Sequence, residues 1–275
     1  MNQQQKDKQV YDEARSFLLS STPDEITEEI LESYLSLPSP THDNISLKDL
    51  YHRLLASAQN ANMKVDVIGG SIGGVQNIGQ VLFDFEHEKV LEEYSGNTER
   101  MLDNIIKILK PKGKIRRTPK SIWPKYCRTI ISGAEFFAQF RDSKAFLDWV
   151  DHFYKDKKSL AALPMILEAE IYGIGFPLAC DFLKELGYIN YGKPDVHIIE
   201  IFEATGLTEK GASNYQVLKA ITRISENINL SAYNVDKLFW LIGSGYFYDH
   251  IHIGNKGRVG RMKESFIEHM ESKIA

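Results

Sequence analysis

The chain contains little cysteine and no long hydrophobic run. Its two cysteines, Cys127 and Cys180, are too few for a disulfide framework, an all-cysteine zinc site or an iron–sulfur cluster. Both lie in apolar helical patterns, so we expect buried free thiols. No stretch reaches the roughly eighteen apolar residues of a transmembrane helix, and the N-terminus lacks the apolar run of a signal peptide. These absences predict a cytoplasmic protein.

Acidic residues are absent from one segment of a chain whose formal net charge is −4. Residues 104–134 contain 9 Lys and Arg and no Asp or Glu, whereas residues 1–103 contain 8 basic and 18 acidic side chains. A concentrated basic segment is suited to phosphate contacts with nucleic acid, and a solvated basic loop is the alternative. The cations are Lys107, Lys110, Lys112, Lys114, Arg116, Arg117, Lys120, Lys125 and Arg128.

Apolar residues recur at helical spacing along most of the chain, which predicts an all-α, mainly helical fold. The sequence Thr22-Pro23-Asp24-Glu25 has the form of a capping box and predicts the start of a helix. Residues 65–85 combine apolar residues with clustered glycines, and they predict either a short β element or a loop against the core. Further helices are expected at 98–110, 121–140, 143–154, 158–170, 176–186, 195–205, 213–228, 232–242 and 260–273.

Glycines at 173 and 175 indicate a tight turn between two helices, in the sequence Ile171-Tyr172-Gly173-Ile174-Gly175. Glycine permits backbone conformations closed to other residues and removes side chains that would block close approach. Amide N–H groups just before the next helix would then form a small donor site, and such sites bind phosphate. We expect Ile171 and Ile174 to anchor the turn in the core. An ordinary helix–helix turn is the alternative.

A carboxylate, Asp195, stands at the start of the helix that follows the hairpin. A fixed carboxylate can stabilise the positive charge that develops on a sugar when an N-glycosidic bond breaks, and it can orient or deprotonate a water. The alternative is that Asp195 only caps its helix, and both roles are compatible. His197 is given no catalytic role, and Asp181 is expected to face solvent.

The hairpin with Ala179, followed by Pro194-Asp195-Val196-His197-Ile198, resembles the helix-hairpin-helix DNA glycosylase superfamily. The family pattern is a hairpin of the type L-P-G-V-G, an alanine four residues after the second glycine, and then V-D-T/V-H-V. The resemblance is specific over about residues 158–207. It implies a two-lobed helical fold with a glycosylase core at 96–275 (hairpin 158–187). Residues 1–95 lie outside the resemblance, and we expect them to form an N-terminal helical extension that packs on this core.

The resemblance also implies roles for individual residues. Gly173, Ile174 and Gly175 would hold DNA phosphates, with a monovalent cation on the hairpin carbonyls, and Asp195 matches the catalytic aspartate. Members that also cleave the strand carry a lysine at the position of Pro177, and proline cannot be a nucleophile. The resemblance therefore implies a monofunctional glycosylase that leaves an abasic site. Members with an iron–sulfur cluster carry four C-terminal cysteines, and no cysteine follows Cys180.

The partner expected from these features is double-stranded DNA with a damaged or modified base, bound by a nucleoid-associated monomer without a metal, another cofactor or a membrane. Further DNA contacts are assigned to Arg116, Arg117 and Lys120. A flipped base needs an apolar or aromatic pocket, and its candidates are Trp123, Tyr126, Phe136 and Tyr172. The alternatives are a non-catalytic helix-hairpin-helix DNA-binding protein, a helical interaction module, and a defence enzyme acting on hypermodified phage bases.

Overall fold

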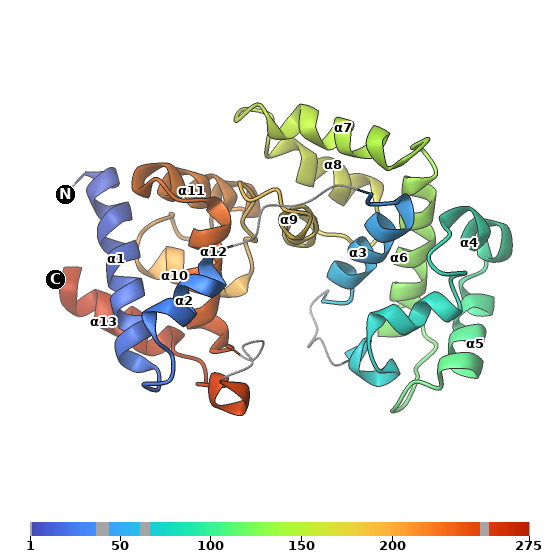
Figure 1. The fold of residues 1–275 in the computed structure, drawn as a ribbon, viewed down its shortest axis with the longest axis horizontal. Coiled ribbons are helices and arrows are strands. Elements are labelled where there is room, and N and C mark those ends of the chain that lie inside the picture. The colour runs from blue at the N-terminus through green and yellow to red at the C-terminus, as the bar shows by residue number, and fades with distance from the viewer. Residues whose placement is uncertain (1, 37–43, 61–66, 248–252, 275) are drawn as a thin grey trace. The chain divides into compact units, whose positions relative to one another are not determined.

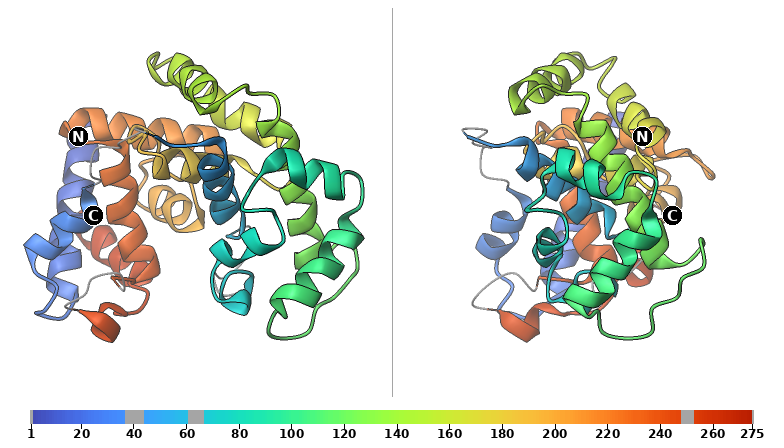
Figure 2. Two further views of the ribbon diagram at one scale, coloured as in Figure 1. Left: turned by 45° about the vertical axis from the view of Figure 1, so that its right-hand side comes forward. Right: turned by 90° about the vertical axis from the view of Figure 1, so that its right-hand side faces the viewer.

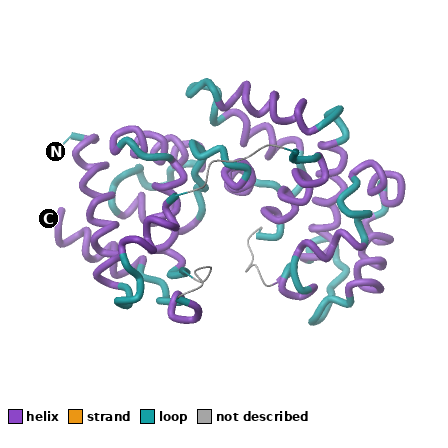
Figure 3. The backbone as a smooth tube through the Cα atoms, in the orientation of Figure 1, coloured by secondary structure: helices purple, strands orange, loops and turns teal. Residues whose placement is uncertain are grey.

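The computed structural model describes residues 2–36, 44–60, 67–247 and 253–274, and the structural statements below concern these residues. They form helices joined by loops and short 3₁₀ turns (Figures 1 and 3). Extended pairing within these ranges is limited to a bridge between Tyr246 and Arg258. The all-α expectation is therefore confirmed. None of the helices described is long and apolar enough to cross a membrane.

The chain forms two compact units, and each is described by itself. Unit 1 comprises Met1–Pro40 and Gly187–Ala275, and unit 2 comprises Thr41–Leu186. The N-terminal helices pack on the C-terminal part of the chain, whereas the helices at 47–58 and 87–94 pack on the central helices.

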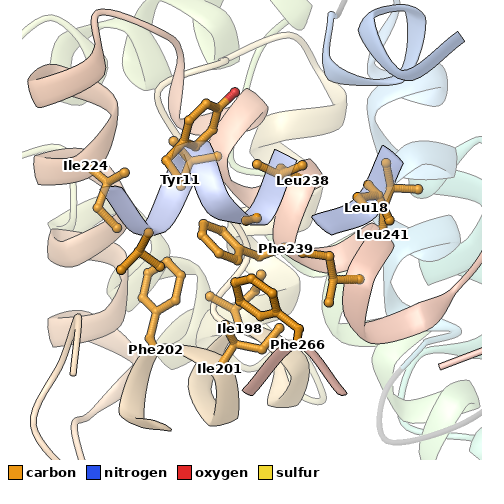
Figure 4. Close-up of a cluster of buried hydrophobic side chains, with 14 of the residues drawn as sticks. Tyr11, Leu18, Ile198, Ile201, Phe202, Ile224, Leu238, Phe239, Leu241 and Phe266 are labelled. Carbon is orange, nitrogen blue, oxygen red and sulfur yellow. The ribbon is translucent and has the colours of Figure 1, made fainter. Parts of the chain in front are cut away.

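Unit 1 has one apolar core, to which helices from both ends of the chain contribute (Figure 4). Tyr11 and Leu18 of the first helix belong to this core together with Phe239 of a C-terminal helix. Each large apolar side chain buried in this way contributes about 2 kcal/mol, so the N-terminal helix is an integral part of the unit. The helices are α1 (Gln3–Ser21), α2 (Glu28–Leu35), α10 (Val196–Ala204), α11 (Asn214–Ile228), α12 (Ala232–Ser244) and α13 (Lys263–Ile274).

A buried carboxylate also ties α1 to α11. Asp7 is fully buried and accepts hydrogen bonds from Arg223 Nε at 2.8 Å and from Asn227 Nδ2 at 2.7 Å. A buried charge is tolerated only when it is paired and hydrogen-bonded, and these donors meet that requirement. This contact fixes the N-terminal segment on the C-terminal helices.

Unit 2 is organised around α6 (Ile122–Phe137), which packs against α3, α4 and α5 (Figure 2). At its C-terminal end, Phe136 and Phe137 stack with Phe146 of α7. The rings meet edge-on or tilted, as aromatic pairs prefer. The other helices are α3 (Leu47–Ala58), α4 (His87–Tyr94), α5 (Thr98–Leu109), α7 (Ser143–Tyr154), α8 (Ala162–Glu170) and α9 (Phe176–Glu185), with 3₁₀ turns η2 (Gly70–Ile72) and η3 (Val75–Gln80).

One expectation about local structure was wrong. Thr22 ends α1 in an extended conformation, which is usual before a proline, and the next helix starts after Thr27, whose hydroxyl caps Ile30 N. Residues 67–85 contain 3₁₀ turns, so of the two alternatives the loop against the core agrees with the structure and the β element does not. Residues 65 and 66 lie outside the described residues.

Candidate nucleic-acid interface and carboxylate site

The hairpin is a five-residue turn between α8 and α9. Ile171 and Ile174 are buried, as expected, and Ile174 N donates to Ile171 O at 3.1 Å. The carbonyl of Gly175 accepts from the first turn of α9. Gly175 O accepts from both Leu178 N and Ala179 N, so of these two carbonyls only Ile171 O keeps a lone pair for a cation. The turn is therefore anchored by two apolar side chains and closed by its own backbone.

Glycine is required at 173 but not at 175. Gly173 has a φ of 83°, in the left-handed region, and a Cβ there would overlap Thr129 Oγ1 on α6. Gly175 has a φ of −84° and caps α9, and a Cβ there would meet no atom closer than 3.8 Å. The first glycine lets the turn lie directly on α6, and the second leaves open space before a helix N-terminus.

The outer side of the turn carries backbone donors and a cation. In the described part of the chain, the N–H groups of Gly173 and Gly175 donate to no protein group. Ser132 Oγ accepts from Tyr172 N at 2.9 Å, and the Arg128 guanidinium lies 3.9 Å from the centre of the Tyr172 ring. Exposed donors next to a helix N-terminus and a stacked arginine are suited to binding a phosphate.

One face of α6 connects this turn with the basic segment. Ser121, Lys125, Arg128 and Ser132 are spaced four, three and four residues apart, so they lie along one side of the helix. Lys125 and Arg128 are exposed, whereas the opposite side of the helix is buried. Trp123, close to Ser121, lines a cavity of about 960 Å³ in the basic segment. A polar stripe therefore runs along α6 from this cavity to the hairpin.

The three cations assigned to DNA binding have different surroundings. Arg116 and Lys120 are exposed and line the cavity. Arg117 is paired with Asp103 of α5, with 2.7 Å between Nη1 and Oδ1, and it does not line the cavity. An exposed ion pair contributes little to stability, but it offsets the charge that Arg117 could offer to a phosphate.

The four aromatic candidates for a base pocket also differ. Tyr126 is buried and donates to Leu55 O at 3.0 Å, and Phe136 lies in the aromatic core, so both serve packing. Trp123 is 5% exposed and lines the larger cavity, and Tyr172 is 37% exposed and lines a smaller one of about 270 Å³ beside Arg128. Trp123 and Tyr172 are therefore the candidates that a ligand could reach.

Asp195 lies in unit 1 and caps α10. Its Oδ1 accepts from His197 N at 2.9 Å and from Ile198 N at 3.2 Å. Both bonds use the same oxygen, so capping occupies one half of the carboxylate. The side chain is half-buried. The cap therefore fixes the carboxylate at the positive end of a helix, where a negative charge is stabilised.

Burial and two charged neighbours act on this carboxylate. Burial raises the pKa of Asp195, the nearby carboxylate of Asp236 raises it further, and the positive charge of Lys193 opposes both. Asp236 is buried on α12, and a Cβ on Gly192 would lie 3.2 Å from its Cβ. The segment before Asp195 therefore runs close against α12. A fixed carboxylate with a raised pKa can exchange a proton with a water or a leaving group.

Sequence reasoning missed several of these neighbours. Asp236, Ser132 and the stacking of Arg128 on Tyr172 were not identified, because no pattern in the sequence relates residues on different helices. The expectation that Asp181 faces solvent was wrong. It is 8% exposed and accepts from Ser57 Oγ at 2.9 Å. No local signal in the sequence distinguishes this position from an exposed one.

Comparison with known proteins relates the fold to solved DNA glycosylases. No protein-family model matches the sequence, and no curated protein matches it. The Methanocaldococcus jannaschii 8-oxoguanine glycosylase/lyase in complex with DNA containing 8-oxoguanine is similar, with a TM-score of 0.53 and 18% identity over 83% of this chain and 98% of that chain. A second structure of 8-oxoguanine DNA glycosylase from this organism gives a TM-score of 0.52 and 18% identity over 89% and 98% of the two chains. At this identity the comparison shows the fold.

Replacing Gly173 tests whether the turn conformation depends on α6. Gly173→Ala should lower the free energy of unfolding by about 1–3 kcal/mol, the typical cost of a strained backbone position. DNA affinity should fall with it, because the donor site is distorted. Thr129→Ala is the matched variant, since it removes the atom that the new Cβ would overlap. The double variant should recover part of the loss in denaturant unfolding. Purely additive effects in this cycle would contradict the contact.

Proposed function

We propose that this chain is a monofunctional DNA glycosylase, which flips a damaged or modified base and hydrolyses its N-glycosidic bond. The observation that carries the proposal is the fold. It is shared over 98% of the M. jannaschii glycosylase chain, and this chain presents both an exposed glycine hairpin and a fixed carboxylate. The hairpin would bind the DNA backbone and Asp195 would act on the sugar. The hairpin without the carboxylate, or the carboxylate without the hairpin, would not support the proposal.

In this mechanism the ionised Asp195 stabilises the positive charge that develops on the deoxyribose as the base leaves. Its Oδ1 is held by the cap, so the carboxylate has a fixed direction. The same carboxylate can orient or deprotonate the water that attacks the sugar carbon. The products are a free base and an intact strand with an abasic site. No cofactor is assigned to any of these steps.

The proposal covers four classes of base, which are oxidised, alkylated, deaminated and bulky phage-type bases. They are distinguished by incubating the protein with DNA panels that carry each modification, followed by detection of released base by mass. Release of a bulky phage-type base would make this a defence enzyme, and release of a small lesion would make it a repair enzyme.

Asp195→Asn tests the electrostatic role of the carboxylate. Asparagine keeps the size of the side chain and caps helices as well as aspartate, so melting temperature and DNA affinity should stay close to wild type. Base release should fall about 100-fold or more, the typical loss for a key stabilising group. Full activity in the folded variant would remove Asp195 from the mechanism.

The pH dependence of base release tests the surroundings of Asp195. Burial and Asp236 raise the pKa of Asp195, and the ionised form is the active one. Activity should therefore fall as pH falls through a value above the ordinary aspartate pKa of about 3.9. Asp236→Asn removes a negative neighbour, lowers the pKa of Asp195 and should move this acid limb to lower pH. Lys193→Ala removes a positive neighbour and should move it to higher pH. A limb that stays in place in both variants would contradict this account.

Borohydride trapping tests the monofunctional assignment. A lysine amine that attacked the sugar would form a Schiff base, which borohydride reduces to a stable protein–DNA adduct. Pro177 lies in the first turn of α9 and has no amine, so we expect no adduct, and strand breaks only after alkali. An adduct that disappears in Lys193→Ala would show that another lysine supplies the amine and would overturn the assignment.

A further inference from the structure

A cavity of about 960 Å³ in unit 2 lies where the basic segment meets the first 3₁₀ turn. Two segments form its walls, residues 67–71 on one side and residues 112–123 on the other. The backbone joins them, because Lys112 N donates to Ser71 O at 2.9 Å. The cavity is therefore a feature of the folded backbone and does not depend on one side chain.

The charge around the cavity is of one sign. Lys112, Lys114, Arg116 and Lys120 line it, and no aspartate or glutamate is among the described residues that do so. All four cations are exposed. Such a group attracts phosphate and releases counterions on binding, which makes affinity salt-dependent.

The N-terminus of α6 also opens into the cavity. Ser121, the residue before the helix, provides no side-chain cap, and its hydroxyl instead lies 2.7 Å from Thr118 Oγ1. The first turn of α6 carries no acidic residue. The positive end of a sixteen-residue helix thus adds to the four cations, and it is an independent reason for an anion to bind here.

The remaining wall is apolar. Val67 and Ile122 are each 37% exposed, and both line the cavity together with Trp123. An inorganic anion would gain no binding free energy from contact with such a surface. A nucleobase would gain binding free energy, because its apolar face is removed from water. The volume lies in the range of small-molecule pockets, about 300–1,000 Å³. It is large enough for an unstacked nucleotide and too small for a length of duplex.

We propose that this cavity binds an unstacked nucleotide of a single DNA strand, with its phosphate on the cations and its base against the apolar wall. The polar stripe of α6 favours a strand over a free nucleotide. Ser132, which holds the hairpin, lies nine residues after Trp123, or about 14 Å along the helix axis. A strand that occupies the cavity can therefore continue along Lys125 and Arg128 to the hairpin donors. The proposal goes beyond base excision, because it requires no base to be released.

Arg116 and Arg117 provide a matched pair of variants for the test. They are adjacent, equally charged and both exposed, but only Arg116 lines the cavity, and Arg117 is paired with Asp103. A fluorescein-labelled pentathymidylate is titrated with the full-length protein at several salt concentrations, and binding is followed by anisotropy. Arg116→Ala should weaken binding and lower the slope of log affinity against log salt by about 0.7, the value for one phosphate of a single strand. Arg117→Ala should have a clearly smaller effect on both, because Arg117 is paired with Asp103 and does not line the cavity.

A third variant tests the apolar wall. Ile122→Ala should weaken binding of the pentanucleotide without changing the salt slope, because it removes base contact and no charge. Thymidine monophosphate and inorganic pyrophosphate serve as competitors, and a weak effect of both is expected. Equal effects of Arg116→Ala and Arg117→Ala, or no binding by the wild type, would overturn the site. If thymidine monophosphate competes as strongly as the strand, the nucleotide need not belong to a strand, and that part of the proposal is overturned. If pyrophosphate competes equally, the base makes no contact with the apolar wall, and that part is overturned. None of these readouts depends on glycosylase activity.

Discussion

The close approach of the hairpin to α6 is the constraint on which the proposed DNA-binding surface of unit 2 depends. Only a glycine fits at 173, because Thr129 lies where any Cβ would be. The same approach lets Ser132 accept from Tyr172 N and places Arg128 over the Tyr172 ring. One face of α6 builds the core of the unit and the other holds the hairpin. A change that moved the turn away from α6 would thus alter its anchoring and its donors together.

Asp195 illustrates how one side chain can have both a structural and a chemical role. Its Oδ1 satisfies two backbone donors at the start of α10, which accounts for its position without any reference to catalysis. The carboxylate is nevertheless placed beside Asp236, and both this neighbour and burial favour the protonated form. Stability alone would be served as well by asparagine or serine at the cap. The proposed chemistry requires, in addition, a carboxylate that carries a charge and is held in a fixed direction.

Helix periodicity predicted most of the fold, because burial in a helical unit repeats every three to four residues. The expected helices at 98–110, 143–154 and 213–228 agree with the structure within a residue or two. The first helix was not predicted, although its buried positions recur at helical spacing, because Gln3–Ser21 is rich in polar residues and one of the buried positions is the charged Asp7. The capping box at Thr22 was also wrong. Thr22 and Thr27 both precede acidic residues, and only the packing of α2 on α12 decides which of them starts the helix.

The sequence alone determined the features that are local to the chain. These are the helical fold class, the hairpin with its glycines, the cap at Asp195 and the absence of a lysine at Pro177. The tertiary structure decided which members of each candidate group a ligand can reach. Arg116 lines the cavity while Arg117 pairs with Asp103, and Trp123 borders the cavity while Phe136 is buried. Neighbouring positions differ in this way because burial and ion pairing depend on contacts between distant segments, which periodicity and spacing do not encode.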